Sequence, residues 1–92
     1  MKTVHLIISG KVQGVFFRAK AKNVAEKYGI KGWIKNTPDE KVEALVTGEP
    51  DNLKNFITWC KSGPEQAIVE DVSVSPKPEI IFKDFEVIRK NV

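Results

Sequence analysis

Residues 10–18 read Gly10-Lys11-Val12-Gln13-Gly14-Val15-Phe16-Phe17-Arg18 and join two segments with different hydrophobic periods. The segment before them, residues 3–8, is apolar and β-branched, which is typical of a buried strand. The segment after them carries one apolar stripe at helical spacing, formed by Phe17, Ala21, Val24, Ala25 and Tyr28. Glycines at positions 10 and 14 permit a tight backbone path between the two segments. The chain is therefore predicted to begin with a strand, a turn and a helix, and the helix runs from about Phe16 to just before Gly29.

Four further strands and a second helix are predicted along the rest of the chain. The strands are expected over residues 30–35, 42–47, 67–75 and 85–89, where β-branched and aromatic residues are frequent. The loop over residues 36–41 contains Asn, Pro and Asp, which favour turns, so the strands on either side of it form a hairpin. The second helix lies between Pro50 and Gly63-Pro64, and its apolar stripe is Leu53, Phe56, Ile57 and Cys60.

We read the order of these elements as β-α-β-β-α-β, the ferredoxin-like arrangement. An α+β sandwich is expected, in which an antiparallel sheet carries two helices on one face. A chain of 92 residues is too short to bury two separate cores, so a single domain over residues 1–92 is expected. Because this fold hosts many functions, it predicts none of them by itself.

The composition narrows the class of protein. No apolar run approaches the about 20 residues needed to cross a bilayer, and the apolar residues after Lys2 are too few for a signal peptide. The only cysteine, Cys60, cannot form an internal disulfide and is expected in the core, which fits a cytoplasmic protein. Zinc is not expected, because the only histidine, His5, lies far from Cys60 in sequence and is predicted to be structural. We expect neither a metal nor a cofactor.

The turn over residues 10–18 has the parts of an anion site. The first-turn donors without helical partners are the amides of Val15, Phe16, Phe17 and Arg18. The Arg18 guanidinium suits bidentate contact with phosphate. Nine of the fifteen Lys and Arg residues lie within residues 1–46, with only four of the twelve acidic residues, and this excess favours an anionic ligand. A lysine-rich, solvated helix face explains the excess equally well. The residues alone also leave open a plain turn with a solvent-facing arginine.

Two blocks of the sequence resemble the acylphosphatase family. Residues 10–18 are similar to its pattern Gly-x-Val-Gln-Gly-Val-x-Phe-Arg. Residues 29–36, which read Gly-Ile-Lys-Gly-Trp-Ile-Lys-Asn, resemble its Gly-x-x-Gly-aromatic-Val-x-Asn. Gly63-Pro64 followed by Ala67 and Val69, and Asp84-Phe85 at the last strand, extend the resemblance over nearly the whole chain.

This resemblance implies an enzyme that hydrolyses the carboxyl–phosphate bond of a small acyl phosphate, giving a carboxylate and inorganic phosphate. It implies that Arg18 and Asn36 are catalytic. It also implies a phosphate-binding set, able to hold inorganic phosphate or another anion, which comprises Gln13, Gly14, Val15, Phe16, Phe17 and Arg18. The family usually has Asp-Gly in the hairpin where this chain has Asp39-Glu40. Since a glycine would ease a positive φ, a different turn is expected here.

The chemistry of acyl phosphates fits a site without histidine. The leaving carboxylate has a parent acid with a pKa of roughly 4, so it departs without a protein acid to protonate it. Arg18 and the loop amides are expected to stabilise the phosphoryl charge, and Asn36 is expected to orient the attacking water. No general base is evident, so a phosphoryl oxygen of the substrate is expected to take the proton. Without the resemblance, Asn36 reads as a turn former, and the two roles are compatible.

Two alternatives belong to other classes of protein. One is a non-catalytic ferredoxin-like binding module for RNA or a protein partner, although the aromatic Arg/Lys-Gly-Phe-Gly-Phe pattern of RNA-binding sheets is missing. The other is an acylphosphatase-like domain with a regulatory role. Such domains occur in longer proteins, and this chain shows no extension. We expect a free-standing, monomeric enzyme that binds neither a membrane nor nucleic acid.

Overall fold

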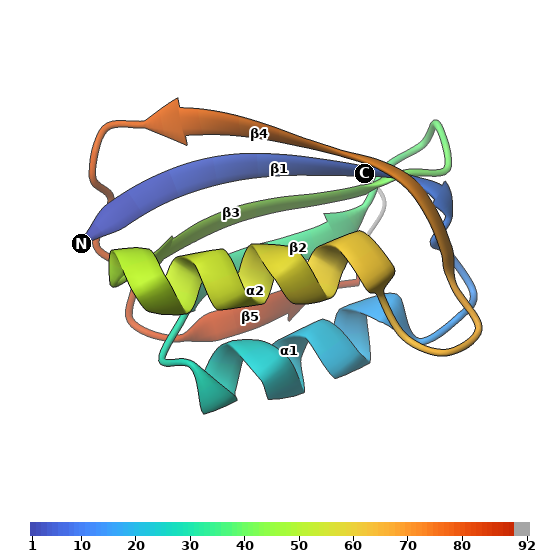
Figure 1. The fold of residues 1–92 in the computed structure, drawn as a ribbon. Coiled ribbons are helices and arrows are strands. Elements are labelled where there is room, and N and C mark those ends of the chain that lie inside the picture. The colour runs from blue at the N-terminus through green and yellow to red at the C-terminus, as the bar shows by residue number, and fades with distance from the viewer. Residues whose placement is uncertain (90–92) are drawn as a thin grey trace.

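Residues 1–89 are described in the computed structural model. They contain the five strands and two helices expected along the sequence, which is one strand more than the order β-α-β-β-α-β contains. In chain order the elements are β1 (Lys2–Lys11), α1 (Phe17–Lys27), β2 (Lys31–Asn36), β3 (Val42–Gly48), α2 (Pro50–Ser62), β4 (Ile68–Lys77) and β5 (Phe85–Ile88) (Figure 1). Each predicted strand and helix is present, with bounds shifted by at most a few residues.

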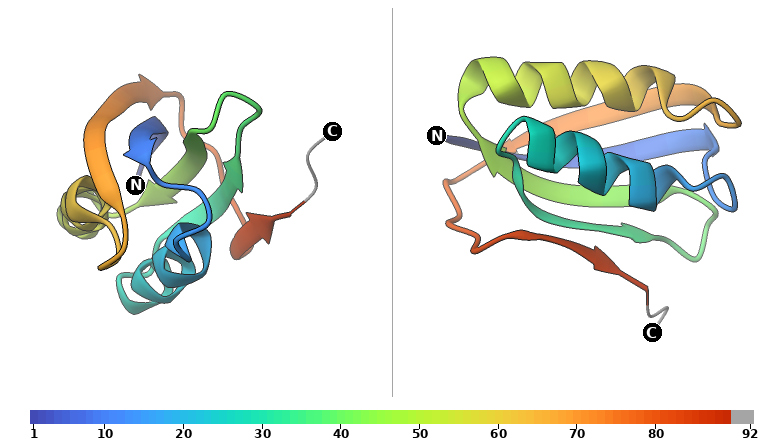
Figure 2. Two further views of the ribbon diagram at one scale, coloured as in Figure 1. Left: turned by 90° about the vertical axis from the view of Figure 1, so that its right-hand side faces the viewer. Right: turned by 90° about the horizontal axis from the view of Figure 1, so that it is seen from below.

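The strands form one sheet in the order β4-β1-β3-β2-β5. β1 pairs antiparallel with both β3 and β4, and β2 pairs antiparallel with β3. Both helices cover the same face of this sheet, as the end-on view in Figure 2 shows, so the predicted ferredoxin-like sandwich is confirmed. β5 departs from the antiparallel pattern, because it lies beside β2 and runs parallel to it. β4 ends at the end of the sheet where β2 begins (Figure 1). β5 therefore starts near the first residues of β2 and runs in the same direction.

The core lies between the sheet and the helices. Alternate residues of β1, namely Val4, Leu6 and Ile8, are buried toward the helices, as the two-residue period of a strand requires. The helix stripes predicted from the sequence meet them, with Phe17 and Phe56 almost fully buried. Cys60 of α2 is also buried, and desolvation raises the pKa of its thiol to about 12. The predicted core role of this cysteine is confirmed.

Gly10 marks the point where β1 bends into the turn. The register between β1 and β4 shifts between Ser9 and Gly10, and the φ of Gly10 is 123°. A Cβ atom at this position would lie 2.1 Å from the carbonyl oxygen of Ile68, which is too close for any side chain. The bulge increases the local twist of the strand. It therefore carries the chain out of the sheet and toward the start of α1.

The hairpin between β2 and β3 places Glu40 where the family usually has glycine. Glu40 has a φ of 67°, the left-handed conformation that a glycine adopts readily. Its amide donates to the carbonyl oxygen of Thr37 at 3.2 Å, and the Thr37 amide donates to the carbonyl oxygen of Lys41 at 2.9 Å. These bonds fix the turn across the loop and outweigh the local preference of a non-glycine residue for negative φ.

Replacing Glu40 by glycine is expected to raise the free energy of unfolding by about 0.5–1 kcal/mol. The left-handed conformation costs a residue with a Cβ atom about 1–2 kcal/mol, and glycine removes this cost. Part of the gain is lost again because glycine makes the unfolded chain more flexible. Thermal unfolding followed by circular dichroism measures the change. Glu65→Gly is the matched control, since Glu65 is exposed and has no positive φ. A lower melting temperature for Glu40→Gly would contradict the prediction.

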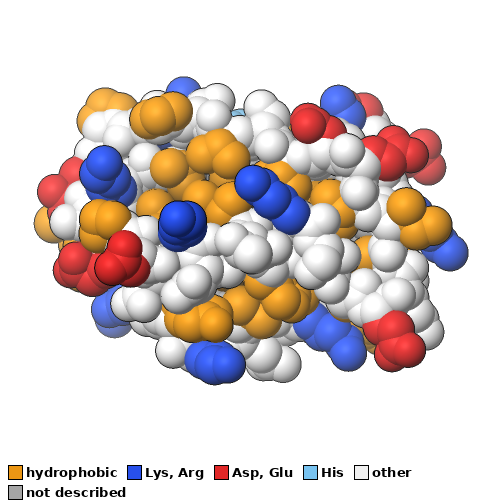
Figure 3. Space-filling view, viewed as in Figure 1, with side chains coloured by type: hydrophobic (Ala, Val, Ile, Leu, Met, Phe, Trp, Pro, Cys, Tyr) orange, Lys and Arg blue, Asp and Glu red, His pale blue; other side chains and the backbone are white. Residues whose placement is uncertain are grey.

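The surface of the helix-bearing face is mixed in charge. Lys and Arg side chains are spread across this face and are not gathered in one patch, while Asp and Glu side chains lie mostly toward its two ends (Figure 3). A spread of this kind fits the interpretation of the lysines as a solvated helix face. None of the helices in residues 1–89 is long and apolar enough to cross a membrane.

Candidate active site

The turn before α1 exposes main-chain donors at the start of the helix. Gly14 has a φ of 72°, and Phe16, the N-cap residue, has a φ of 63° with its side chain exposed. No side chain caps this end of α1. Within residues 1–89, the amides of Gly14, Val15 and Phe16 donate no hydrogen bond to another backbone carbonyl. A bulky residue in the left-handed region is a strained feature that clusters at functional sites.

Arg18 is the second residue of α1 and is half-buried beside β5. One of its terminal nitrogens, Nη1, donates a hydrogen bond of 3.2 Å to the carbonyl oxygen of Ile88. Burial lowers the pKa of the guanidinium, and the nearby charge of Arg89 lowers this pKa further. An arginine remains protonated at neutral pH despite such shifts. It therefore supplies a fixed positive charge whose orientation is set by the last strand.

Asn36 ends β2 and faces the same cavity as Arg18. This cavity has a volume of about 270 Å³ and is lined by Gly14, Phe16, Arg18 and Asn36, among other residues. The side-chain oxygen of Asn36, Oδ1, is buried and has no hydrogen-bond partner within the described chain. A buried acceptor without a partner is rare and costs about 1–3 kcal/mol, so it calls for an explanation such as a bound water or ligand. The two residues predicted to be catalytic are thus brought together, although they lie on different elements.

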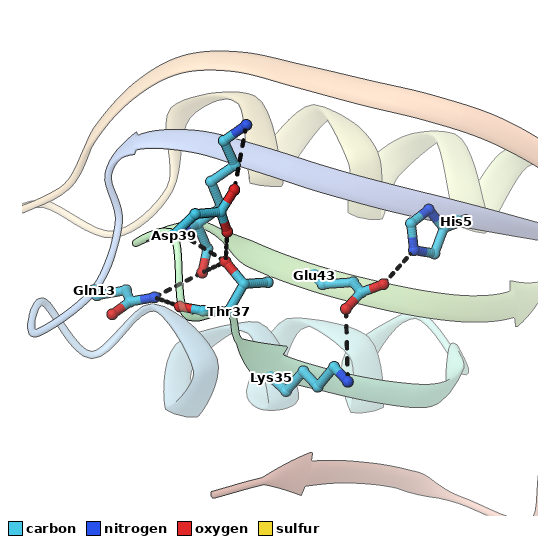
Figure 4. Close-up of polar contacts among 7 residues, drawn as sticks. His5, Gln13, Lys35, Thr37, Asp39 and Glu43 are labelled. Atoms are coloured by element: carbon cyan, nitrogen blue, oxygen red, sulfur yellow. Dashed lines mark hydrogen bonds and ion pairs between the residues drawn. The ribbon is translucent and has the colours of Figure 1, made fainter. Parts of the chain in front are cut away.

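Gln13 connects the turn before α1 to the hairpin that follows Asn36. Its side-chain nitrogen donates to the carbonyl oxygen of Thr37 at 2.9 Å and to that of Lys41 at 2.8 Å (Figure 4). The hydroxyl of Thr37 accepts from the Lys41 amide at 3.0 Å and also contacts the carboxylate of Asp39. The side chain of Gln13 therefore holds the loop next to Asn36. The sequence placed Gln13 in the phosphate-binding set and gave no sign of this contact.

Another polar cluster lies on the sheet and is separate from the cavity. His5 Nε2 lies 2.6 Å from one carboxylate oxygen of Glu43, and Lys35 Nζ lies 3.7 Å from the other (Figure 4). These residues come from the neighbouring strands β1, β3 and β2. The expected structural role of His5 agrees with this pairing. Within residues 1–89, no group of three or more His, Cys, Asp or Glu side chains is placed to hold a metal ion.

The similarity of this chain to known proteins covers all of its helices and nearly all of its sheet. The family model described as Acylphosphatase matches residues 4–87. An acylphosphatase of Marinobacter nauticus is 46% identical over 82 residues, which cover 88% of this chain and 89% of that relative.

Solved structures agree with this match. The crystal structure of an acylphosphatase from Bacillus subtilis has a TM-score of 0.92 and 32% identity, with 96% of this chain and 99% of that chain covered. An acylphosphatase from Coxiella burnetii has a TM-score of 0.91 and 37% identity, with 95% and 92% covered. These similarities favour an enzyme over a non-catalytic binding module. The chain belongs to the acylphosphatase family, whose activity is the hydrolysis of acyl phosphates.

Proposed function

We propose that the acylphosphatase activity of this chain depends on Arg18, on the amides at the start of α1 and on Asn36. The observation that carries the proposal is the shared cavity, which Arg18 and Asn36 both line, together with the buried Oδ1 atom of Asn36, which has no hydrogen-bond partner within the described chain. The phosphoryl group would lie against the amides of residues 14–18 and the Arg18 guanidinium. Its charge would then be met by fixed donors, which need no reorganisation during the reaction.

Asn36 is proposed to orient the attacking water. Its Oδ1 atom can accept a hydrogen from that water, which leaves a lone pair of the water oxygen directed at phosphorus. As the new oxygen–phosphorus bond forms, the bond from phosphorus to the carboxyl oxygen breaks and its electron pair leaves with the carboxylate. The proton of the water passes to a phosphoryl oxygen. The products are a carboxylate and inorganic phosphate, and no protein acid or base is consumed.

The proposal is tested by following the hydrolysis of benzoyl phosphate, whose aromatic absorbance changes as the carboxylate is released. We expect turnover by the purified chain to be unchanged after treatment with a chelator, because the roles above need no metal ion. Inorganic phosphate is expected to inhibit competitively, since it would occupy the same donors. Loss of activity on chelation that returns with a divalent cation would contradict the metal-free site.

Gln13 is proposed as a positioning residue that acts through the hairpin. We expect Gln13→Met to lower kcat by about 10²-fold, because loss of both hydrogen bonds frees the loop beside Asn36 and a displacement of about 1 Å costs that much. The inhibition constant for phosphate should change little, since Arg18 is untouched. Gln66→Met makes the same change at an exposed position and is expected to behave as wild type. An equal loss of phosphate affinity and of kcat would show a general disruption instead.

The remaining expectations from the sequence stay predictions. The monomeric state is checked by light scattering of the purified chain. The cytoplasmic location, and the main-chain contacts of residues 13–18 with phosphate, are likewise parts of this proposal.

A further inference from the structure

A second cavity adjoins the one that holds Arg18 and Asn36. It has a volume of about 540 Å³ and lies between α1 and β5, with Lys22, Asp84 and Glu86 in its lining. Ala19 and Arg89 line both cavities, so the two lie side by side on the protein. Ala19, which lies between them, has the smallest side chain that contains a Cβ atom. A ligand longer than a phosphoryl group can therefore extend from the first cavity into the second.

The end of the second cavity nearest Arg18 is cationic. Lys22 follows Arg18 by four residues and so lies on the same side of α1. Arg89 lies close enough to Arg18 for its positive charge to lower the pKa of the Arg18 guanidinium. Among residues 1–89, the ion pairs involve neither Lys22 nor Arg89.

The two acidic residues of the lining lie away from this end. Glu86 pairs with Trp33 of β2, whereas its neighbours Phe85 and Val87 pack toward the core, so alternation turns Glu86 to the face of the sheet opposite α1. Asp84 precedes β5 and lies near the end of α1, while Arg89 follows β5 near the start of α1, as the right-hand view of Figure 2 shows for the two elements. The cations and the carboxylates are therefore separated along the cavity.

We propose that the second cavity binds the acyl end of the substrate, and that Lys22 and Arg89 select acyl phosphates whose acyl group carries a second anionic group. This inference rests on the proposed function of Arg18 and Asn36. Because water and leaving group lie on opposite sides of phosphorus in an in-line displacement, the acyl group leaves on the side away from the water. Asn36 lines the first cavity and not the second, so we assign the acyl group, which leaves on the side away from the water held by Asn36, to the second cavity.

The test compares two substrates that differ only at the far end of the acyl chain. Butanoyl phosphate ends in a methyl group, and succinyl monophosphate ends in a carboxylate on a chain of the same length. For the wild-type chain, kcat/KM is expected to be about 3- to 5-fold higher for succinyl phosphate, since a partly exposed ion pair contributes up to about 1 kcal/mol, a factor of about 5. This ratio should fall toward 1 as the salt concentration rises, because exposed charges are screened.

The variants Lys22→Ala and Arg89→Ala are expected to lower the same ratio, and the double variant should bring it to about 1. Lys20→Ala is the matched control, since Lys20 is an exposed lysine of α1 that lines neither cavity, and its ratio should equal that of wild type. A wild-type ratio of 1, or a ratio that the Lys22 and Arg89 variants leave unchanged, would overturn the inference. Hydrolysis of both substrates in that case would leave the proposed function standing, whereas hydrolysis of neither would overturn the proposed function as well.

Discussion

Replacing Arg18 by alanine is expected to lower kcat/KM for benzoyl phosphate by about 10³- to 10⁵-fold, the loss that follows removal of a transition-state arginine in other phosphoryl-transfer enzymes. The guanidinium is half-buried and held by the carbonyl oxygen of Ile88, so it is positioned before the substrate arrives. Steady-state hydrolysis measures the loss, and circular dichroism shows whether the variant is folded. Loss of the single hydrogen bond to Ile88 costs only about 1 kcal/mol, so the fold should persist.

Two further variants sharpen this prediction. Arg18→Lys keeps the charge but lacks the planar fork, so it should recover little of the lost activity. Lys20→Ala removes a cation two residues away on the exposed side of α1 and should retain wild-type activity. If Arg18→Lys were as active as wild type, a point charge would suffice and bidentate contact would not be required. If Arg18→Ala kept a tenth or more of the activity, Arg18 would have no catalytic role.

Replacing Asn36 by alanine is expected to lower kcat by about 10²- to 10³-fold, a loss typical of removing one group that is preorganised for the transition state. The inhibition constant for inorganic phosphate should change much less, because Asn36 is proposed to orient water and not to hold the phosphoryl charge. Asn55→Ala, at an exposed position of α2, is the control and should behave as wild type.

Stability provides an independent readout for Asn36. Its Oδ1 atom is buried without a partner, which costs folding free energy, so Asn36→Ala should be as stable as wild type or more so. A residue that lowers stability while it serves the reaction is the expected trade-off at an active site. A large drop in melting temperature together with the loss of kcat would show instead that Asn36 acts mainly as a structural turn residue.

Local patterns in the sequence were enough to predict the elements of the fold. The stripe that includes Phe17 and Ala21 predicted α1, and the stripe that includes Phe56 and Cys60 predicted α2, because burial against a sheet imposes the helical period. The parallel pairing of β5 could not be predicted in this way. A strand of four residues carries no information on its partner, which is set by where β4 delivers the chain.

The candidate site depended on contacts that no local pattern encodes. The side chain of Gln13 reaches carbonyl groups 24 and 28 residues further along the chain, so its neighbours in sequence say nothing about this role. Glu40 takes a conformation that its own preference opposes, because hydrogen bonds across the hairpin fix it. The chemistry assigned to Arg18 and Asn36 came from the family resemblance, whereas spacing alone supported only an anion site.

The hydrogen bond between Arg18 and the carbonyl oxygen of Ile88 spans 70 residues of sequence. During synthesis, the turn that carries Arg18 leaves the ribosome long before the strand that orients it. A nascent chain can therefore complete its first helix and hairpin while the guanidinium still lacks this partner. The guanidinium proposed to bind the substrate is thus fixed in place only when β5 has docked beside β2, so we expect full activity to appear with completion of the sheet.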